Sequence, residues 1–412
     1  MKILTFIHSF DPGGVERVAL RLVRDWRTRG VDAPLFVGRG EGVMRDDVGK
    51  DLSYECPRQP RFGSAWWETF WMIFTLPRVI LRLRPDVLFC PGNTYTVVAF
   101  CMKVLLGRHC PPIMVKISNE LEWSQKSASA RFWYRIWLWL QGRAFTCAVA
   151  MEEAMAPEIV RYLHLRPDQV TVIPDPALTG ELLAVLGSAP RPYWQPGQPR
   201  HFVAVGRLVR QKNLPLMLDA FAQGAAPSDR LDLIGDGPDR AALEEQVAAL
   251  GLCDRVRFLG YRPEPALELR HYHALLLSSD FEGVPAVLLE ALAAGIAIVA
   301  TTCSASVASL LGRGRFGTLV PLRDCAALAD AIARLAPGRK DRAAHFVAAS
   351  RFTTEVAGPA YLRQAALLAG KPWHTPESRP ATAPNAGAAR VELPRGPIAA
   401  MADAAPIHAP VI

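Results

Sequence analysis

Short apolar segments alternate with longer helical patterns along this chain, and the alternation occurs twice. The apolar segments of the first half have the length of buried strands, and they are Lys2–His8, Asp86–Cys90, Ile113–Ile117 and Val170–Ile173. After the first of them, the apolar residues of Val15–Arg29 recur at helical spacing on one face. Alternating strands and helices build a parallel sheet with helices on both faces, so the sequence predicts an α/β, doubly wound domain.

The segment Gly187–Pro199 is dense in proline and glycine, which predicts a linker between two domains. The alternation restarts after this segment, with predicted strands at His201–Val205, Leu231–Ile234, Val256–Leu259, Ala274–Ser278, Ile296–Ala300 and Gly317–Val320. We therefore predict one Rossmann-like domain over residues 1–185, a linker over 186–200 and a second Rossmann-like domain over 201–370. Residues 371–412, rich in proline and alanine, predict a disordered tail.

Length and composition support this division and exclude several classes of protein. A chain of 412 residues exceeds the roughly 250–300 residues at which a single hydrophobic core stops growing. Its eight cysteines form no C-x-x-C pair and no zinc-spaced cluster, so we expect no metal site and a reducing compartment. The net charge of +8 is shared by both halves, which argues against a nucleic-acid partner. We find neither a signal peptide nor a spanning segment, and expect a cytoplasmic protein.

The stretch Ser278–Gly295 contains the first candidate site. A buried strand ends at Ser278, a polar loop follows, and Pro285 suits the first turn of a helix that Gly295 ends. The free N–H groups and the positive end of that helix predict an anion site at residues 283–286.

Two glutamates belong to this stretch. Glu282 precedes the predicted anion site, and Glu290 lies in the helix among apolar neighbours. A carboxylate in such surroundings needs a partner. The neighbouring hydroxyls of a ribose would serve, and so would an arginine at the rim of the site; the spacing alone leaves both open.

The loop after the strand His201–Val205 is the second candidate site. It contains Gly206, Arg207 and Lys212 and leads into a helix. Two cations at the carboxyl edge of a sheet suit a diphosphate, whose charge they would neutralise as it leaves. Most basic residues of this chain are arginines, so a lysine here hints at a compact point charge. A solvated basic turn is the alternative.

Two glycine-rich turns are weaker signals. Gly13 and Gly14 lie between the first strand and the first helix, and Ile234–Pro238 links a strand to a helix in the second half. Glycine lets a backbone approach a ligand at a helix N-terminus. Many such turns need only the conformational freedom, so each turn alone decides nothing.

In their order along the chain, these segments resemble glycosyltransferase family 4, the nucleotide-sugar-dependent retaining enzymes with the two-Rossmann GT-B fold. The resemblance rests on Gly-Gly-Val-Glu-Arg at 13–17, Gly-Arg-Leu…Gln-Lys-Asn at 206–213, Ile-Gly-Asp-Gly-Pro at 234–238, and Glu282 with Glu290. It is dense over residues 201–322, thinner over 1–185, and does not extend to the tail.

The resemblance implies a role for each candidate residue. Arg207, Lys212 and Glu282 would be catalytic, with the two cations on the diphosphate and the glutamate near the sugar. The residues implied to bind the nucleotide-sugar are Gly14, Gly206, Gly283, Val284 and Glu290. Metal is generally not required in this family. The chain contains no Asp-x-Asp metal motif, which agrees with that expectation.

One position departs from the family pattern. Many members place a histidine after the central strand of the first domain, near the anomeric carbon, whereas Ile113–Ile117 is followed by Ser118, Asn119 and Glu120. Asn119 or Glu120 could take that place by hydrogen bonding. We expect His8 and His109 to be structural or surface residues.

Aromatic and basic residues mix in two segments of the first half. Trp67, Phe70, Trp71 and Phe74 share one helical face with arginines after them, and Arg131–Leu140 repeats the mixture. Basic helices with tryptophan suit the headgroup region of an anionic membrane, so we expect peripheral contact with the inner face of the cytoplasmic membrane. The alternative is that these aromatic residues form the core of the first domain.

The sequence thus predicts a retaining hexosyltransferase that uses GDP-mannose or a UDP-hexose and a lipid-linked glycan acceptor in the biosynthesis of a surface polysaccharide, exopolysaccharide or lipopolysaccharide. A sugar-nucleotide isomerase or hydrolase on the same fold would share the phosphate and ribose residues. A non-catalytic protein that binds nucleotide-sugar is the other alternative.

Overall fold

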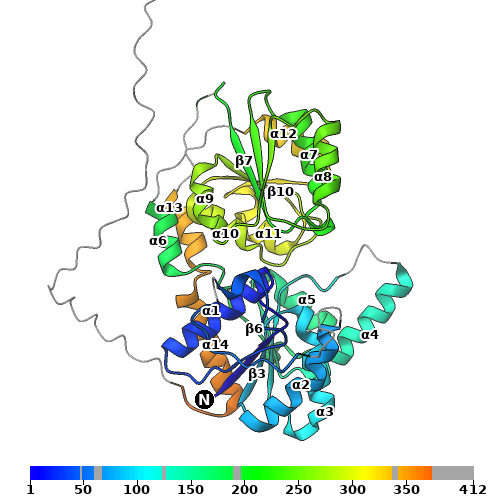
Figure 1. Cartoon of the computed structure of the whole chain (residues 1–412), viewed down its shortest axis with the longest axis vertical. Helices are drawn as coiled ribbons and strands as arrows, with labels where there is room; N and C mark the ends of the chain where they lie inside the picture. The colour runs from blue at the N-terminus through cyan, green and yellow to red at the C-terminus, as the bar shows by residue number, and fades with distance from the viewer. Residues whose placement is uncertain are drawn as a thin grey trace, which may run out of the picture. The chain divides into compact units, whose positions relative to one another are not determined.

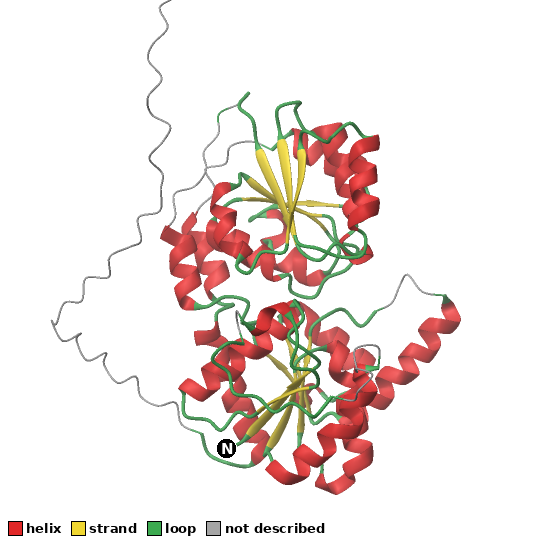
Figure 2. Cartoon of the chain, in the orientation of Figure 1, coloured by secondary structure: helices red, strands yellow, loops and turns green. Residues whose placement is uncertain are grey.

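Two parallel six-stranded sheets organise the part of the chain that the computed structural model describes, namely residues 1–46, 49–59, 67–122, 127–188, 195, 197–335 and 342–373 (Figure 2). Both sheets have helices on both faces, which confirms the predicted α/β, doubly wound class. Every pairing between neighbouring strands is parallel. The carboxyl ends of the strands in each sheet therefore lie at one edge, where ligands of such sheets bind.

The first sheet has the strand order β2-β1-β3-β4-β5-β6. Its strands are β1 (Ile3–Ile7), β2 (Leu35–Val37), β3 (Val87–Cys90), β4 (Ile113–Ile117), β5 (Cys147–Ala150) and β6 (Val170–Val172). Its connecting helices are α1 (Gly14–Thr28), α2 (Glu68–Leu83), α3 (Thr96–Leu106), α4 (Ala128–Ala144) and α5 (Ala156–Leu163). In Figure 1, α1 lies on one side of this sheet and α2 and α3 lie on the other, as right-handed crossovers require.

The second sheet has the order β12-β11-β10-β7-β8-β9. Its strands are β7 (His201–Val205), β8 (Arg230–Ile234), β9 (Val256–Gly260), β10 (Ala274–Leu277), β11 (Ala297–Thr301) and β12 (Thr318–Val320). Its helices are α7 (Leu214–Gly224), α8 (Arg240–Ala249), α9 (Pro265–Glu268), α10 (Ala286–Ala294), α11 (Ala305–Leu310) and α12 (Cys325–Ala333). The strand order reverses between β7 and β10, which is the switch point at which doubly wound sheets bind ligands.

The last helix of the described chain returns to the first sheet. α13 (Arg342–Ser350) packs with α6 (Gly180–Ser188) and α10, whereas α14 (Thr354–Ala369) packs on α1. The ring of Tyr361 in α14 lies 6.2 Å from Trp26 and 5.5 Å from Phe89 of the first sheet's core. The range 201–370 predicted for the second domain therefore contains a helix that packs with the first, because its buried apolar face contacts that sheet.

Most predicted strands and helices are confirmed within a residue or two. The strands β2 and β5 were not predicted, since three or four apolar residues give little periodicity. The predicted tail from residue 374 and residues 189–194 and 196 of the predicted linker lie outside the described residues. No helix within the described ranges is long and apolar enough to cross a membrane.

The alternative that the aromatic residues form the core is wrong for Phe70 and Phe74 of α2 and for Phe132 and Trp133 of α4, which are exposed, whereas Tyr134 is half-buried and packs against the core. Phe70 is 63% and Phe74 66% exposed, while the buried face of α2 consists of Met72, Leu76 and Ile80. On α4, Trp133 is 67% exposed. Figure 1 shows the N-terminal part of α4 extending away from the neighbouring helices.

Candidate active site

The neighbouring strands β7 and β10 place three predicted residues at one edge of the second sheet. Arg207 and Lys212 follow β7, and Glu282 follows β10. The Nζ of Lys212 lies 2.6 Å from Oε1 of Glu282, and the hydroxyl of Ser279 donates to the same oxygen at 2.6 Å. The structure thus brings a lysine and a glutamate, 70 residues apart, into a charge-assisted hydrogen bond.

Hydrogen bonds to backbone carbonyls hold the two loops together. The Ser278 hydroxyl donates to the carbonyl of Lys212 at 2.8 Å, and the N–H of Asp280 donates to the carbonyl of Gln211 at 2.8 Å. Gln211 in turn donates from its side chain to the carbonyl of Phe281 at 2.9 Å. These contacts fix the position of Lys212 relative to Glu282, so the basic loop is not a loosely solvated turn.

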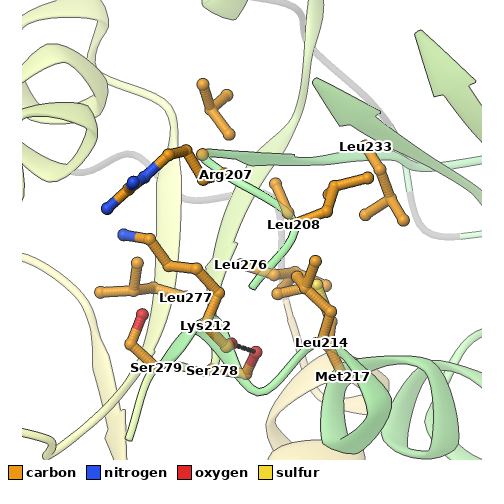
Figure 3. A pocket seen from close by; sticks show the side chains of 13 residues that line it. Arg207, Leu208, Lys212, Leu214, Met217, Leu233, Leu276, Leu277, Ser278 and Ser279 are labelled. Atoms are coloured by element: carbon orange, nitrogen blue, oxygen red, sulfur yellow. Dashed lines mark hydrogen bonds between the residues drawn. The ribbon is translucent and has the colours of Figure 1, made fainter. Parts of the chain in front are cut away.

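Gly206 gives the first loop its direction. Its φ is +152°, in the region that favours glycine, and a Cβ there would lie 3.1 Å from Cε of Lys212. The Lys212 stem therefore lies over the backbone of Gly206. In Figure 3 the Arg207 guanidinium and the Lys212 ammonium point to the same side of the pocket that both residues line. Arg207 is exposed, and no ion pair to it occurs within the described residues.

The helix α10 begins one residue later than predicted, with Pro285 at its N-cap, and it ends at Gly295 with φ +67° as predicted. Val284 is buried just before it. A Cβ on Gly283 would lie 2.0 Å from the carbonyl oxygen of Ser118, which follows β4 of the first sheet. Only a glycine fits there, because the two loops meet backbone to backbone.

Glu290 is buried on α10, and two arginines of α1 face it. Burial raises the pKa of its carboxyl group, and the charges of Arg21 and Arg17 oppose that rise. Arg17 also donates to the carbonyl of Pro263 at 3.0 Å, so α1 contacts the second sheet's loops. An arginine partner for Glu290 was one of the two interpretations that the spacing left open; the ribose role stays a prediction. Sequence reasoning did not select Arg21, although it lies one helical turn after Arg17.

Gly14 is the first residue of α1, and a Cβ on it would meet nothing within 4 Å. The preceding Gly13 is different, since a Cβ there would lie 1.9 Å from the carboxylate of Glu16. Glu16 accepts a hydrogen bond of 2.5 Å from the hydroxyl of Tyr95. Gly14 therefore leaves open space at the helix N-terminus, and its predicted phosphate contact remains a prediction.

Glu120 faces the second domain across the site. Its carboxylate accepts a hydrogen bond from the backbone of Ala305 at the start of α11. Burial, together with the charges of Glu158 and Glu122, raises the pKa of Glu120 to about 7. Burial, followed by the charges of Glu282 and Glu120, raises the pKa of Cys303 to about 12, so this thiol is not a nucleophile.

The two histidines are structural or surface residues, as expected. The His8 ring lies 4.5 Å from that of Tyr95, and burial lowers the pKa of His8 to about 4. His109 is exposed. Within the described ranges, no group of three or more histidine, cysteine or acidic residues could hold a metal ion.

A cavity of about 760 Å³ adjoins these loops. The first sheet's side supplies residues that follow β3 and β4 and residues of α3 and α4. The second sheet's side supplies Arg210, Gln211, Asp280, Phe281, Cys303, Leu322 and Arg323. Asn119 and Glu120 both line it. Sequence reasoning did not find this cavity, because its walls come from segments far apart in the chain.

Comparisons with known proteins find similarity to glycosyltransferases. A family model described as "Glycosyl transferases group 1" matches residues 199–337, and one described as "Glycosyltransferase Family 4" matches residues 12–177. Between them the two matches cover most of the described chain.

Two curated relatives differ in how much of them the chain covers. Lipopolysaccharide core biosynthesis glycosyltransferase LpsE of Rhizobium meliloti is 25% identical over 377 residues, 90% of this chain and 100% of LpsE. Exopolysaccharide phosphotransferase SCO2592 of Streptomyces coelicolor is 39% identical over 132 residues, 31% of this chain and 14% of that protein. The chain thus spans all of LpsE and a small part of SCO2592. Other relatives are named for colanic acid and lipopolysaccharide biosynthesis.

Among solved structures, Anabaena Alr3699/HepE in complex with UDP and glucose is similar with a TM-score of 0.68 and 20% identity, over 89% of this chain and 99% of that chain. This likeness shows that the two chains share the GT-B fold.

Proposed function

Since the chain carries domains of two glycosyltransferase families, which make it a sugar-transferring enzyme, we propose that it moves a hexose from a nucleotide-sugar to a lipid-linked glycan acceptor with retention at the anomeric carbon. The observation that carries the proposal is the Lys212–Glu282 hydrogen bond of 2.6 Å beside Arg207, at the edge of the sheet where a diphosphate would lie.

The two cations supply the chemistry that the reaction needs. As the bond between the anomeric carbon and the diphosphate oxygen breaks, negative charge grows on the departing nucleoside diphosphate. We assign the neutralisation of that charge to Arg207 and Lys212, and we therefore propose no metal. The acceptor oxygen forms the new bond on the same face of the sugar, and its proton passes to the departing phosphate oxygen. Glu282, held by Lys212 and Ser279, lies where it can orient the sugar.

We assign the nucleotide end to the residues around α10. Gly206, Gly283 and Val284 belong to the loops at this edge of the sheet and would contact the donor through their backbones, and Glu290 would accept hydrogen bonds from the ribose hydroxyls. Gly14 would face the phosphates from the first domain. In the described structure the charges of Arg17 and Arg21 face Glu290, so donor binding would add a ribose to a carboxylate that already has cations nearby.

Donor and pathway are proposed from the relatives. HepE was solved with UDP and glucose, which favours a UDP-hexose over GDP-mannose as the first donor to test. The names of LpsE and of the colanic acid relative favour assembly of a surface polysaccharide. The same names favour an acceptor that carries a glycan.

We also propose peripheral contact with the inner face of the cytoplasmic membrane through α2 and α4. Phe132 is 59% and Trp133 67% exposed on α4, which contains Arg131 and Arg135 and no acidic residue. Exposed aromatics beside arginines suit an anionic headgroup layer. The test is sedimentation with phosphatidylglycerol and phosphatidylcholine vesicles. Pelleting with the anionic vesicles, lost in a Phe132→Ser/Trp133→Ser variant but kept in Val347→Ser on α13, supports the contact; no pelleting overturns it.

The central test is a thermal-shift panel of UDP-glucose, UDP-galactose, UDP-N-acetylglucosamine, UDP-glucuronate and GDP-mannose on the wild type and on Glu290→Ala. Saturation at about 100 times the Kd adds roughly 2.7 kcal/mol, which is a rise of a few degrees. A shift with one donor that Glu290→Ala loses supports the assignment. Anomeric NMR of the product then tests retention. Turnover of donor without any acceptor would favour an isomerase or hydrolase, and binding without cleavage would favour a binding protein.

A further inference from the structure

The 760 Å³ cavity has two chemically different kinds of lining. Polar residues of loops form the first: Asn119 and Glu120 after β4, and Arg210 and Gln211 of the loop that carries Lys212. This polar lining adjoins the donor-side residues, because the N–H of Asp280 donates to the carbonyl of Gln211 and both residues line the cavity. An acceptor hydroxyl bound here would lie next to the site of transfer.

The second kind of lining is a mainly apolar wall from the first domain. Its apolar residues are Val97 on α3, Leu121 after β4, and Tyr134, Trp137 and Leu138 on α4. Thr96 and Gln141 of the same helices also line the cavity, and the Gln141 side chain donates to the Thr96 hydroxyl at 3.0 Å. The ring of Trp137 packs edge-on against Phe100 of α3 at 5.1 Å, so this wall is held in place. Phe281 and Leu322 of the second domain also line the cavity.

Volume and lining limit what the cavity can hold. Pockets of about 300–1,000 Å³ with apolar walls and a few polar groups bind drug-sized organic molecules. A glycan alone would bring many hydroxyls against Val97, Leu121 and Leu138, which cannot hydrogen-bond them, and each unpaired hydroxyl would weaken binding. The lining therefore fits a molecule with a small polar head and an apolar chain.

The apolar wall also continues to the surface along α4. Trp133, one turn before Trp137, is 67% exposed, and Phe132 is 59% exposed. A chain longer than the cavity can thus leave it along an aromatic path instead of entering water.

We propose that this cavity binds the acceptor as an amphiphile, with its hydroxyl-bearing head at Asn119 and Glu120 and the isoprenoid or alkyl chain attached to that head along Tyr134, Trp137 and Leu138. The inference rests on the proposed function and deepens it: the enzyme recognises the acceptor's chain directly, and Trp137 sets that specificity.

The test compares methyl β-glucoside with octyl β-glucoside, below its micelle concentration, as probes of the full chain without donor. Isothermal titration should show octyl glucoside binding at least tenfold tighter than methyl glucoside, because each buried methylene contributes to binding. Trp137→Ala should lose at least fivefold of the octyl affinity and leave methyl glucoside unchanged. The matched control is Trp139→Ala, two residues along α4, whose ring packs under Arg143 at 3.4 Å and does not line the cavity.

A second variant guards against a folding defect in Trp137→Ala. Val97→Trp should fill the space beside the apolar wall and reduce the affinity for octyl glucoside. The thermal shift that the donor induces in this variant should equal that of the wild type. Equal affinity for the two glucosides in the wild type, or equal losses in Trp137→Ala and Trp139→Ala, overturns the inference. So does tighter binding of maltose than of octyl glucoside, since that result assigns the cavity to a glycan.

The two proposals fail in different ways. If a donor shifts the melting temperature and its sugar is transferred equally well to methyl and octyl glucosides, the proposed function stands and the amphiphile inference is wrong. If octyl glucoside binds as expected but no donor binds, the cavity assignment stands and the transferase proposal is wrong.

Discussion

The ammonium of Lys212 is 2.6 Å from the carboxylate of Glu282, and each side chain comes from a loop at the carboxyl end of a different strand. Glu282 is buried, and the hydrogen bond from Lys212 fixes the position of its carboxylate. Lys212 keeps two further N–H groups that can donate to a ligand. Arg207 on the same loop adds a second cation. The site therefore holds two cations beside a fixed carboxylate, as the proposed binding of a diphosphate requires.

Lys212→Ala should lower kcat by about 10²–10³, the usual loss when one preorganised donor to a developing charge is removed. The measurement is the initial rate with the donor that the thermal-shift panel selects. Lys212→Arg should recover part of the rate, because it keeps a charge on the same loop. A rise in KM with kcat unchanged would show that Lys212 contributes only to ground-state binding.

Two glycine variants separate domain contact from ligand contact. Gly283→Ala places a Cβ 2.0 Å from the Ser118 carbonyl oxygen, so the loops must move, and we expect a loss of about 2–4 kcal/mol in the free energy of unfolding together with loss of activity. Gly14→Ala meets nothing within 4 Å and should leave stability within about 1 kcal/mol of the wild type.

Donor titration completes that comparison. If Gly14 faces the phosphates, Gly14→Ala should weaken donor binding at least tenfold without a change in melting temperature. Unchanged donor affinity in Gly14→Ala would remove Gly14 from the binding site, and an unchanged melting temperature in Gly283→Ala would contradict the backbone contact with Ser118.

Much of the fold could be predicted because parallel strands are short apolar runs between amphipathic helices. The strand β4 is predicted to the residue, since Ile113–Ile117 is apolar apart from Lys116 and is bounded by prolines and a polar loop. The strand β2 has three residues and no comparable signal. The packing of α14 on α1 could not be predicted for a different reason. The helix has a buried apolar face that includes Tyr361, and the sequence of that face does not indicate which of the two sheets it contacts.

The proximity of Arg207, Lys212 and Glu282 was also predictable, because all three are close to strand ends in sequence. The cavity beside them was not. Trp137 and Arg210 line one cavity but lie far apart in the chain, and no local pattern pairs them. The same holds for Glu290 and Arg21, whose charges meet only once the two domains are in contact.

The buried pair of Lys116 and Asp175 should dominate the stability of the first sheet. Their atoms are 2.7 Å apart, and the side chains are 2% and 5% exposed. Asp175→Asn leaves a buried ammonium without its counter-charge, so we expect a loss of about 3–5 kcal/mol in urea denaturation. The control is Asp168→Asn, whose exposed pair with Arg166 should leave the denaturation midpoint unchanged. Equal midpoints for the wild type and Asp175→Asn would show that water solvates Lys116.

Glu120 should make stability depend on pH. Its pKa is raised to about 7 in the folded chain by burial first and then by Glu158 and Glu122, so ionising it costs free energy in the folded state and almost none in the unfolded state. That cost is absent below the ordinary carboxyl pKa, grows as the pH rises toward 7, and is constant above it. Glu120→Gln keeps an oxygen for the Ala305 N–H but carries no charge. After allowance for solvent screening, we expect the variant to be about 1–2 kcal/mol more stable than the wild type at pH 8.5 and equal to it at pH 4. Urea denaturation of both proteins across this range measures the difference, with the exposed Glu122→Gln as the control that should show a much smaller one. A difference that does not change with pH would mean that Glu120 ionises as an ordinary surface carboxyl.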